Sequence, residues 1–232
     1  MTAPEVIVFD VDGVLVDVTA SYREAIRETV RNLTGELVSN ELIQKFKNEG
    51  GWNNDWELSY KLILDRGRNV EYGQVVDEFN RIFFGNDADG LIQREYWMPG
   101  NGFFTRVQEQ SMLAIFTGRV RYELTPTLER FAPDVAFDPV ITSDDVKNPK
   151  PAPDGLHIIK ERHRGKSMWY LGDTVDDARA AKGAAVPFIG VASKESPRYR
   201  ELVEVLTGEG AFTVLSDVNE LLNLLPTPAG RT

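Results

Sequence analysis

An apolar run that ends in two carboxylates constrains this 232-residue chain more than any other feature. Residues 6–9 read VIVF, and Asp10, Val11, Asp12 and Gly13 follow. The run predicts a strand buried on both faces. Because burying a carboxylate is costly, we expect Asp10 and Asp12 to lie beyond the carboxyl end of the strand, on the same side of the chain. Either the strand end simply meets water, or the two carboxylates share a cation such as Mg²⁺, which a substrate phosphate completes.

Five further apolar segments predict strands, at residues 112–116, 135–141, 168–171, 188–191 and 212–215. Helical patterns separate them, which indicates an α/β fold with a parallel sheet. Residues 19–96 depart from this alternation, because they show helical periodicity and no convincing strand. The first strand is therefore expected to precede a long helical insertion.

Composition excludes several classes of function. The net charge of -10 makes nucleic acid a poor partner, because phosphate backbones need basic surfaces. No apolar run reaches the roughly 18 residues of a membrane span, and no basic region precedes the run that Asp10 interrupts, so neither a membrane partner nor a signal peptide is predicted. The absence of cysteine excludes thiol catalysis and Cys-zinc sites, and it is compatible with a cytoplasmic location.

The two histidines, His157 and His163, lie in a polar segment that reads as a surface helix. We interpret both as structural or solvated, which makes a Ser-His-Asp hydrolase unlikely.

Polar groups also follow three of the other predicted strands, and ligands of α/β sheets bind outside such carboxyl ends. The Thr117 hydroxyl and the Gly118 amide are candidates to hold a phosphate oxygen, although Thr117 is equally natural as a helix N-cap. Arg119 is interpreted as a surface residue. Lys150 lies in a loop stiffened by alternate prolines, which makes it a candidate to neutralise an anion, whereas Lys147 is expected to be solvated.

Three carboxylates open the helix predicted after residues 168–171. Asp173 lies at the strand end, where a metal ligand belongs. Asp177 is about one turn further on and is a candidate to support the metal by holding the residues that bind it. Asp176 is interpreted as a residue that stabilises the helix N-terminus.

These motifs together resemble the haloacid dehalogenase superfamily. The chain contains, in order, DVDGVLVD, a strand followed by Thr117-Gly118, the sequence KPAPD, and GDTVDDARAA. The resemblance is nearest to subfamily I with a C1-type helical cap, in the phosphoglycolate phosphatase and β-phosphoglucomutase branch. It implies a Rossmann-like parallel sheet core, residues 1–18 and 97–232, with an inserted all-helical cap domain, residues 19–96.

The resemblance also implies roles. Asp10 is the nucleophile that forms an aspartyl-phosphate, and Asp12 is the general acid and then the general base. Thr117, the Gly118 amide and Lys150 hold the phosphoryl group. The Asp10 carboxylate, the Asp12 backbone carbonyl and Asp173 bind Mg²⁺, with Asp177 in support.

Discrimination between substrates is expected to come from the cap. Residues 47–56 read KNEGGWNNDW and match the position of the family's specificity loop. Trp52 and Asn53 are our candidates for contact with a small phosphorylated substrate, and Arg23 and Lys47 are spare cations. The same loop has a structural interpretation, in which Asn54 caps a helix and Trp56 belongs to the core.

The leading hypothesis is a Mg²⁺-dependent phosphatase. A phosphomutase would differ in how well the cap excludes water. A phosphonoacetaldehyde-type hydrolase would need a cap lysine such as Lys47 or Lys61, and dehalogenation would need neither an acid at Asp12 nor a metal. A non-catalytic receiver-like regulator ranks far lower, because such a domain is about half this length.

Overall fold

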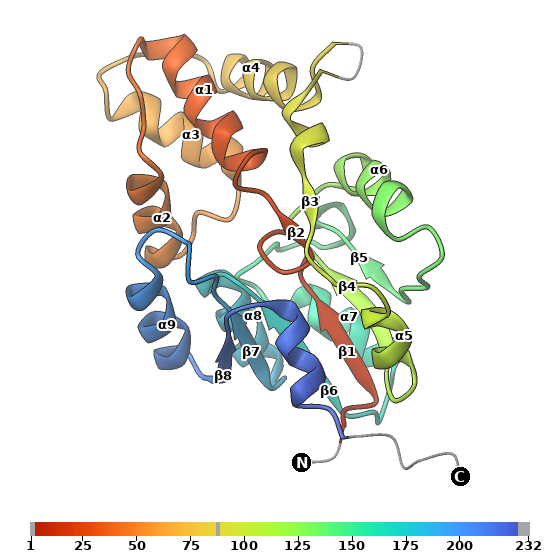
Figure 1. Cartoon of the computed structure of the whole chain (residues 1–232). Coiled ribbons are helices and arrows are strands. Elements are labelled where there is room, and N and C mark those ends of the chain that lie inside the picture. Colours follow the sequence, from red (N-terminus) through yellow and green to blue (C-terminus); the bar gives the residue numbers. More distant parts are fainter. Residues whose placement is uncertain (1–2, 87–88, 227–232) are drawn as a thin grey trace.

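A computed structural model describes residues 3–86 and 89–226, and its centre is a six-stranded parallel sheet (Figure 1). The strands lie in the order β5-β4-β1-β6-β7-β8. Their bounds are β1 Val6–Phe9, β4 Met112–Phe116, β5 Val140–Ile141, β6 Met168–Gly172, β7 Phe188–Val191 and β8 Ala211–Leu215. The predicted α/β fold is confirmed, and β1 occupies the middle of the sheet between β4 and β6.

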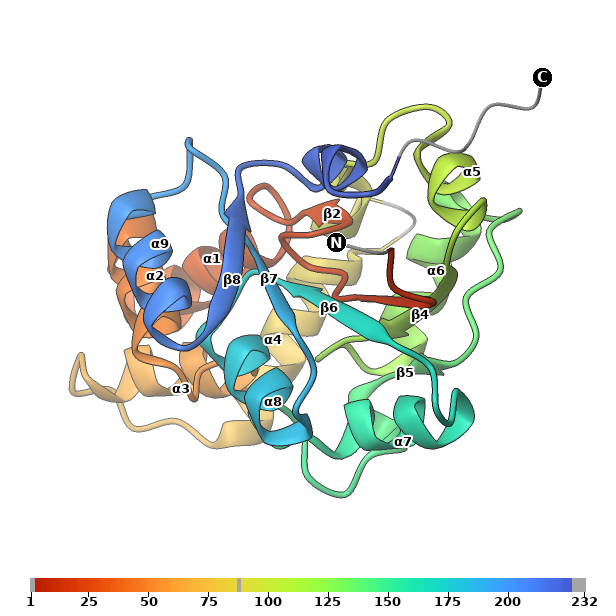
Figure 2. The ribbon, with the colours of Figure 1, turned by 90° about the horizontal axis from the view of Figure 1, so that it is seen from below.

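Helices cover both faces of the sheet, and β1 supplies side chains to both layers. Ile7 and Phe9 belong to one apolar cluster, and Val6 and Val8 belong to the other. Packed with the first cluster are α5 Phe103–Gln108, α6 Arg121–Phe131 and the 3₁₀ helix η3 Val218–Asn223. Packed with the second are α7 Asp154–Arg162, α8 Val175–Ala184 and α9 Tyr199–Gly208. Figure 2 shows α5 on one side of the sheet and α7 with α8 on the other.

The insertion after β1 forms a helical layer with its own apolar core. It contains α1 Tyr22–Thr34, α2 Asn40–Glu49, α3 Asp55–Leu64, α4 Tyr72–Phe84 and the 3₁₀ helix η1 Leu91–Arg94. Ile26, Leu62 and Phe79 are almost fully buried in this core. In Figure 1 these helices lie together above the carboxyl end of the sheet.

The two chain segments that join this helical layer to the sheet pair with each other. β2, Val16–Asp17, and β3, Tyr96–Trp97, form a small antiparallel sheet. The outgoing and return segments therefore lie side by side. Neither strand was predicted, because two residues are too short to produce an alternating pattern.

The predicted strand at residues 135–141 forms only at Val140–Ile141. Pro139 has no N–H to donate to a neighbouring strand. Val135 and Phe137 pack instead against the first apolar cluster from outside the sheet. A 3₁₀ turn, η2 Ser143–Asp145, follows β5.

The two histidines differ in their surroundings. His157 is exposed on α7, whereas His163 is buried and its Nε2 atom lies 2.7 Å from the Asp138 carbonyl oxygen. Within residues 3–86 and 89–226, no helix has both the length and the apolar composition needed to cross a bilayer.

Candidate active site

Asp10 and Asp12 follow the carboxyl end of β1, as expected. Asp10 is buried, and its N–H donates to the Leu171 carbonyl of β6 at 2.8 Å. Gly13 then turns the chain with φ of 70°, which favours glycine. A Cβ atom at Gly13 would lie 2.1 Å from an Asp173 carboxylate oxygen. Glycine therefore lets the loop after β1 approach Asp173 closely.

Lys150 reaches the same place from the loop before α7. Its Nζ atom lies 2.8 Å from Asp10 Oδ1 and 2.6 Å from Asp177 Oδ1. The side chain is 1% exposed, and its ammonium group also lies over the Phe116 ring. Burial alone lowers the pKa of Lys150, but the two carboxylates outweigh burial and raise that pKa. Lys150 therefore stays a cation beside the candidate nucleophile.

Asp10, Asp173 and Asp177 bring their carboxylates together. One oxygen from each lies within 4.8 Å of the others. The Oδ1 atom of Asp173 is buried and accepts no hydrogen bond from the residues that the structure describes. Burial and the neighbouring carboxylates raise the pKa values of Asp10 and Asp173, and this rise is opposed by Lys150 at Asp10 and by Arg23 at Asp173. Convergent carboxylates with an unsatisfied oxygen suit a hard divalent cation such as Mg²⁺.

Asp176 and Asp177 are adjacent, yet they face different parts of the molecule. Asp177 is fully buried and accepts hydrogen bonds from Lys150, from the Tyr170 hydroxyl and from Thr174. Burial raises the pKa of Asp177, but the charge of Lys150 and the hydrogen bonds from Lys150, Thr174 and Tyr170 together hold that pKa below its usual value. The Asp176 carboxylate accepts the N–H of Gly51 at 2.8 and 3.0 Å. Asp176 therefore ties the loop between α2 and α3 to the sheet side of the molecule, besides opening α8.

Thr117 and Gly118 follow β4 next to this cluster. Thr117 is buried and is not the N-cap of α6, which begins four residues later at Arg121. Its Oγ1 atom accepts the N–H of Arg119 at 3.2 Å. A Cβ atom at Gly118 would lie 2.3 Å from the Asn53 Nδ2 atom. Asn53 therefore reaches from the helical insertion to the loop after β4.

A cavity of about 170 Å³ separates the carboxylates from the helical insertion. On the sheet side it is lined by Asp10, Asp12, Gly118 and Asp173, and on the other side by Tyr22, Arg23, Gln44, Asn53, Trp56 and Phe79. Of the two predicted substrate contacts, Asn53 lines this cavity. Trp52 is not among the lining residues and packs edge-on against Phe46, with ring centroids 5.3 Å apart.

The spare cations of the insertion also differ. Arg23 donates from Nη2 to Gln44 at 2.6 Å, and its buried Nη1 atom has no partner among the described residues. Lys47 lines the cavity but forms an ion pair with Asp55 at 2.5 Å. Lys61 pairs with Asp65 and does not line the cavity. Asn54 caps α3, as its structural interpretation predicts, by accepting the N–H groups of Trp56 and Glu57.

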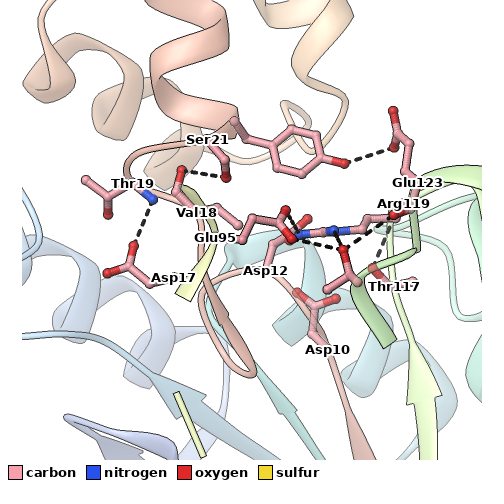
Figure 3. A network of polar contacts seen from close by, with 12 residues as sticks. Asp10, Asp12, Asp17, Val18, Thr19, Ser21, Glu95, Thr117, Arg119 and Glu123 are labelled. Carbon is pink, nitrogen blue, oxygen red and sulfur yellow. Dashed lines mark hydrogen bonds and ion pairs between the residues drawn. The ribbon is translucent and has the colours of Figure 1, made fainter. Parts of the chain in front are cut away.

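Arg119 is the residue that the sequence interpretation missed. It was expected at the surface, but it is 2% exposed, so that expectation is wrong. Its guanidinium group contacts Asp12 and Glu95 (Figure 3). The only available indication was its place directly after Thr117-Gly118, and its burial depends on residues far away in the sequence.

Comparisons with known proteins identify the family of this chain. Residues 4–185 match the family model described as haloacid dehalogenase-like hydrolase. The chain is 28% identical over 245 residues to a protein from Phytophthora nicotianae named imidazoleglycerol-phosphate dehydratase, covering 97% of this chain and 54% of that protein. It is 32% identical over 120 residues to phosphoglycolate phosphatase from Escherichia coli, covering 50% and 45% respectively. The chain thus spans about half the length of these curated relatives.

Solved structures share the fold. A putative haloacid dehalogenase-like hydrolase from Bacteroides fragilis superimposes with a TM-score of 0.75 at 20% identity, covering 94% of this chain and all of that one. A putative HAD-hydrolase from Bacillus subtilis, solved bound to magnesium, gives a TM-score of 0.68 at 16% identity, covering 97% and 99%. At these identities the likeness concerns the fold alone.

Proposed function

The chain belongs to the haloacid dehalogenase-like hydrolases, and we propose that it is a Mg²⁺-dependent phosphohydrolase of a small phosphorylated metabolite. The observation that carries the proposal is the placement of Asp10, buried between the Lys150 ammonium group and the unsatisfied carboxylate of Asp173. A nucleophile, a fixed cation and a metal-binding carboxylate are what phosphoryl transfer needs. The likeness to phosphoglycolate phosphatase supports a phosphate monoester as substrate.

In the proposed reaction Asp10 attacks phosphorus, and the bond from phosphorus to the leaving-group oxygen breaks. Asp12 gives its proton to that oxygen. Water then attacks the aspartyl-phosphate and gives a proton to Asp12, and the bond between phosphorus and Asp10 breaks. Thr117, the Gly118 amide and Lys150 hold the phosphoryl oxygens throughout.

Asp10, Asp173 and the main-chain carbonyl of Asp12 would hold Mg²⁺. When bound, the ion neutralises charge on the phosphoryl group and on the carboxylates. Asp177 supports this set mainly by fixing Lys150, which it contacts at 2.6 Å. The crowded carboxylates around one lysine support a requirement for a second cation.

We place the cap at residues 19–96 and the core at residues 1–18 and 97–232, because the paired linker strands β2 and β3 mark the two crossings. The cavity between the two parts supports a small substrate. The absence of cysteine supports a cytoplasmic location. Lys47, ion-paired with Asp55, and Lys61, outside the cavity, give little support to a Schiff-base hydrolase.

The test is a screen of phosphate monoesters for release of inorganic phosphate, with Mg²⁺ and with EDTA. The panel contains phosphoglycolate, sugar phosphates and an imidazole-bearing phosphate ester, the last because of the name of the Phytophthora nicotianae relative. We expect turnover of at least one ester with Mg²⁺ and none with EDTA, and a trapped phosphoenzyme that adds one phosphoryl group to the mass.

The control is Asp134→Asn, at an exposed aspartate of the loop after α6. This variant should match the wild type throughout. Isomerisation of a sugar phosphate without phosphate release would point to the mutase alternative. Activity on a haloacid without metal would contradict the proposal.

A further inference from the structure

Arg119 is a buried cation that the proposed chemistry does not use. Its side chain is 1% exposed. The guanidinium group donates to a single oxygen of Asp12, from Nε at 2.8 Å and from Nη2 at 2.5 Å (Figure 3). Charge-assisted bonds of this kind are the strong ones, so they fix the orientation of the Asp12 carboxylate.

Two of the three remaining donors of Arg119 are also occupied. Nη2 donates to Glu95 at 2.7 Å, and Nη1 donates to the Thr127 hydroxyl at 2.8 Å. Arginine has five N–H donors, and four of them are used in these contacts. The guanidinium group therefore has no pair of parallel donors left to bind a substrate phosphate. Its role must come from the side chains that it holds in place.

The partners of Arg119 other than Asp12 join the two linkers to α6. Glu95 lies in the return linker directly before β3, and Thr127 of α6 donates to its second oxygen at 2.9 Å. Tyr22 opens α1 at the end of the outgoing linker, and its ring lies 4.9 Å from the guanidinium carbon. The hydroxyl of Tyr22 donates to Glu123 of α6 at 3.0 Å. Arg119 is thus held at the point where both linkers meet the core.

The contact leaves one oxygen of Asp12 available. Both bonds from Arg119 end on Oδ1, and Oδ2 has no hydrogen-bond partner among the described residues. Asp12 lines the cavity, and its side chain is 32% exposed. An acid–base group needs a fixed direction and one free oxygen, and Arg119 provides both conditions.

We propose that Arg119 is a positioning residue for proton transfer, which clamps Oδ1 of Asp12 and directs Oδ2 at the leaving group while Glu95 and Thr127 fix Arg119 to the return linker and α6. This inference rests on the proposed function, because it takes Asp12 as the acid and base. It adds that the hinge of the cap, through Glu95, helps to place that group.

The test compares an alkyl phosphate, taken from the screen above, with p-nitrophenyl phosphate. The kcat/KM value reports departure of the leaving group, and p-nitrophenolate departs without a proton. In Arg119→Lys, the ratio of kcat/KM for the alkyl substrate to kcat/KM for the aryl substrate is expected to fall about tenfold or more. Lysine keeps the positive charge but lacks the two fixed N–H donors that hold Asp12. With the aryl substrate, the same variant should give a burst of p-nitrophenolate, because phosphoenzyme hydrolysis also needs Asp12.

Glu95→Gln provides a milder variant in case Arg119→Lys folds poorly. It keeps the shape of the side chain and weakens the bond to Arg119, so the ratio should fall about threefold. Arg121→Gln is the matched control, because Arg121 is exposed, pairs with Asp145 and does not touch Asp12. The control should leave both the ratio and the burst unchanged.

Equal losses on the two substrates in Arg119→Lys, or no change in Glu95→Gln, would overturn the inference and leave a purely structural arginine. These results differ from a failure of the proposed function. In that case the wild type itself would release no phosphate from either ester.

Discussion

The two walls of the cavity are built in different ways. On the core wall, the buried Asp10 pairs with Lys150, which in turn pairs with Asp177, although neither of these two partners lines the cavity. On the cap wall, the lining is mostly aromatic and amide groups, and the loop that carries Asn53 is tied to the core mainly by the bond from Gly51 to Asp176. The core wall therefore depends on buried ion pairs, whereas the cap wall carries varied side chains and meets the core through separate contacts at Gly51, Tyr22 and Glu95.

This difference follows from what each wall recognises. A transferring phosphoryl group is the same in every candidate substrate, so its partners must be held in one geometry. Buried ion pairs achieve this, because breaking one leaves an uncompensated charge that costs about 3–5 kcal/mol. The leaving group varies between substrates, and a cap on paired linkers can vary with it.

The core wall predicts the largest loss. Asp10→Asn should lower kcat more than about 1,000-fold, because the amide is not a nucleophile and carries no charge toward the metal. Steady-state phosphate release at saturating Mg²⁺ measures this, and circular dichroism should show an unchanged fold. Retention of a tenth of the wild-type kcat would remove the covalent role of Asp10.

The contact between Tyr22 of the cap and Glu123 of the core predicts that the free energy of unfolding depends on pH. Burial raises the pKa of Glu123 from 4.5 to about 7, with Tyr22 and Arg119 opposing the rise. The stability that this group contributes is therefore fully present below about pH 4.5 and is lost as the pH rises through about 7. Relative to Glu123→Gln, the wild type should lose about 3 kcal/mol of unfolding free energy across that window.

Urea denaturation of the wild type and of Glu123→Gln at several pH values measures this difference in unfolding free energy. The contributions of all other titrating groups cancel, because the two proteins share them. Glu129→Gln, at an exposed position of the same helix, should follow the wild type. A constant difference between the wild type and Glu123→Gln at all pH values would mean that Glu123 is ionised with an ordinary pKa.

Adjacent aspartates provide the sharpest comparison of the two walls. Asp177→Asn should lower kcat about 100-fold, because Lys150 loses a charged partner and shifts relative to Asp10. Asp176→Asn should instead raise KM about fivefold with little change in kcat, because it weakens one charge-assisted bond to Gly51 by about 1 kcal/mol. Measuring kcat and KM for both variants tests this difference. Similar losses of kcat in the two variants would show that the cap contact and the core ion pairs do not act separately.

The cap wall predicts the smallest effect on catalysis. Asn53→Ala should lower kcat/KM for the best substrate about tenfold (about 1.4 kcal/mol), and much less for p-nitrophenyl phosphate. Trp52→Ala should mainly lower the melting temperature, because Trp52 packs on Phe46 away from the cavity. If Trp52→Ala changes the ratio of kcat/KM for the best substrate to kcat/KM for p-nitrophenyl phosphate as much as Asn53→Ala does, both residues of the loop contribute to substrate recognition.

Several features of this protein were determined by sequence alone, because they depend on local patterns. The strands at residues 6–9, 112–116 and 188–191 were predicted with their observed bounds, since each is a short apolar run between turns. Asp10 and Asp173 were placed at strand ends because carboxylates cannot continue a buried strand. The resemblance to the haloacid dehalogenase superfamily is confirmed by the family match over residues 4–185.

Other features were decided only by the tertiary structure, because they depend on contacts between distant residues. Arg119 is buried since Glu95, which is 24 positions away, and Asp12, which is 107 positions away, both meet its guanidinium group. Asp176 and Asp177 look equivalent in the sequence, but helix geometry turns one toward Gly51 and the other toward Lys150. A local pattern fixes which residues can be polar, whereas the packing of cap against core fixes which partner each polar group finds.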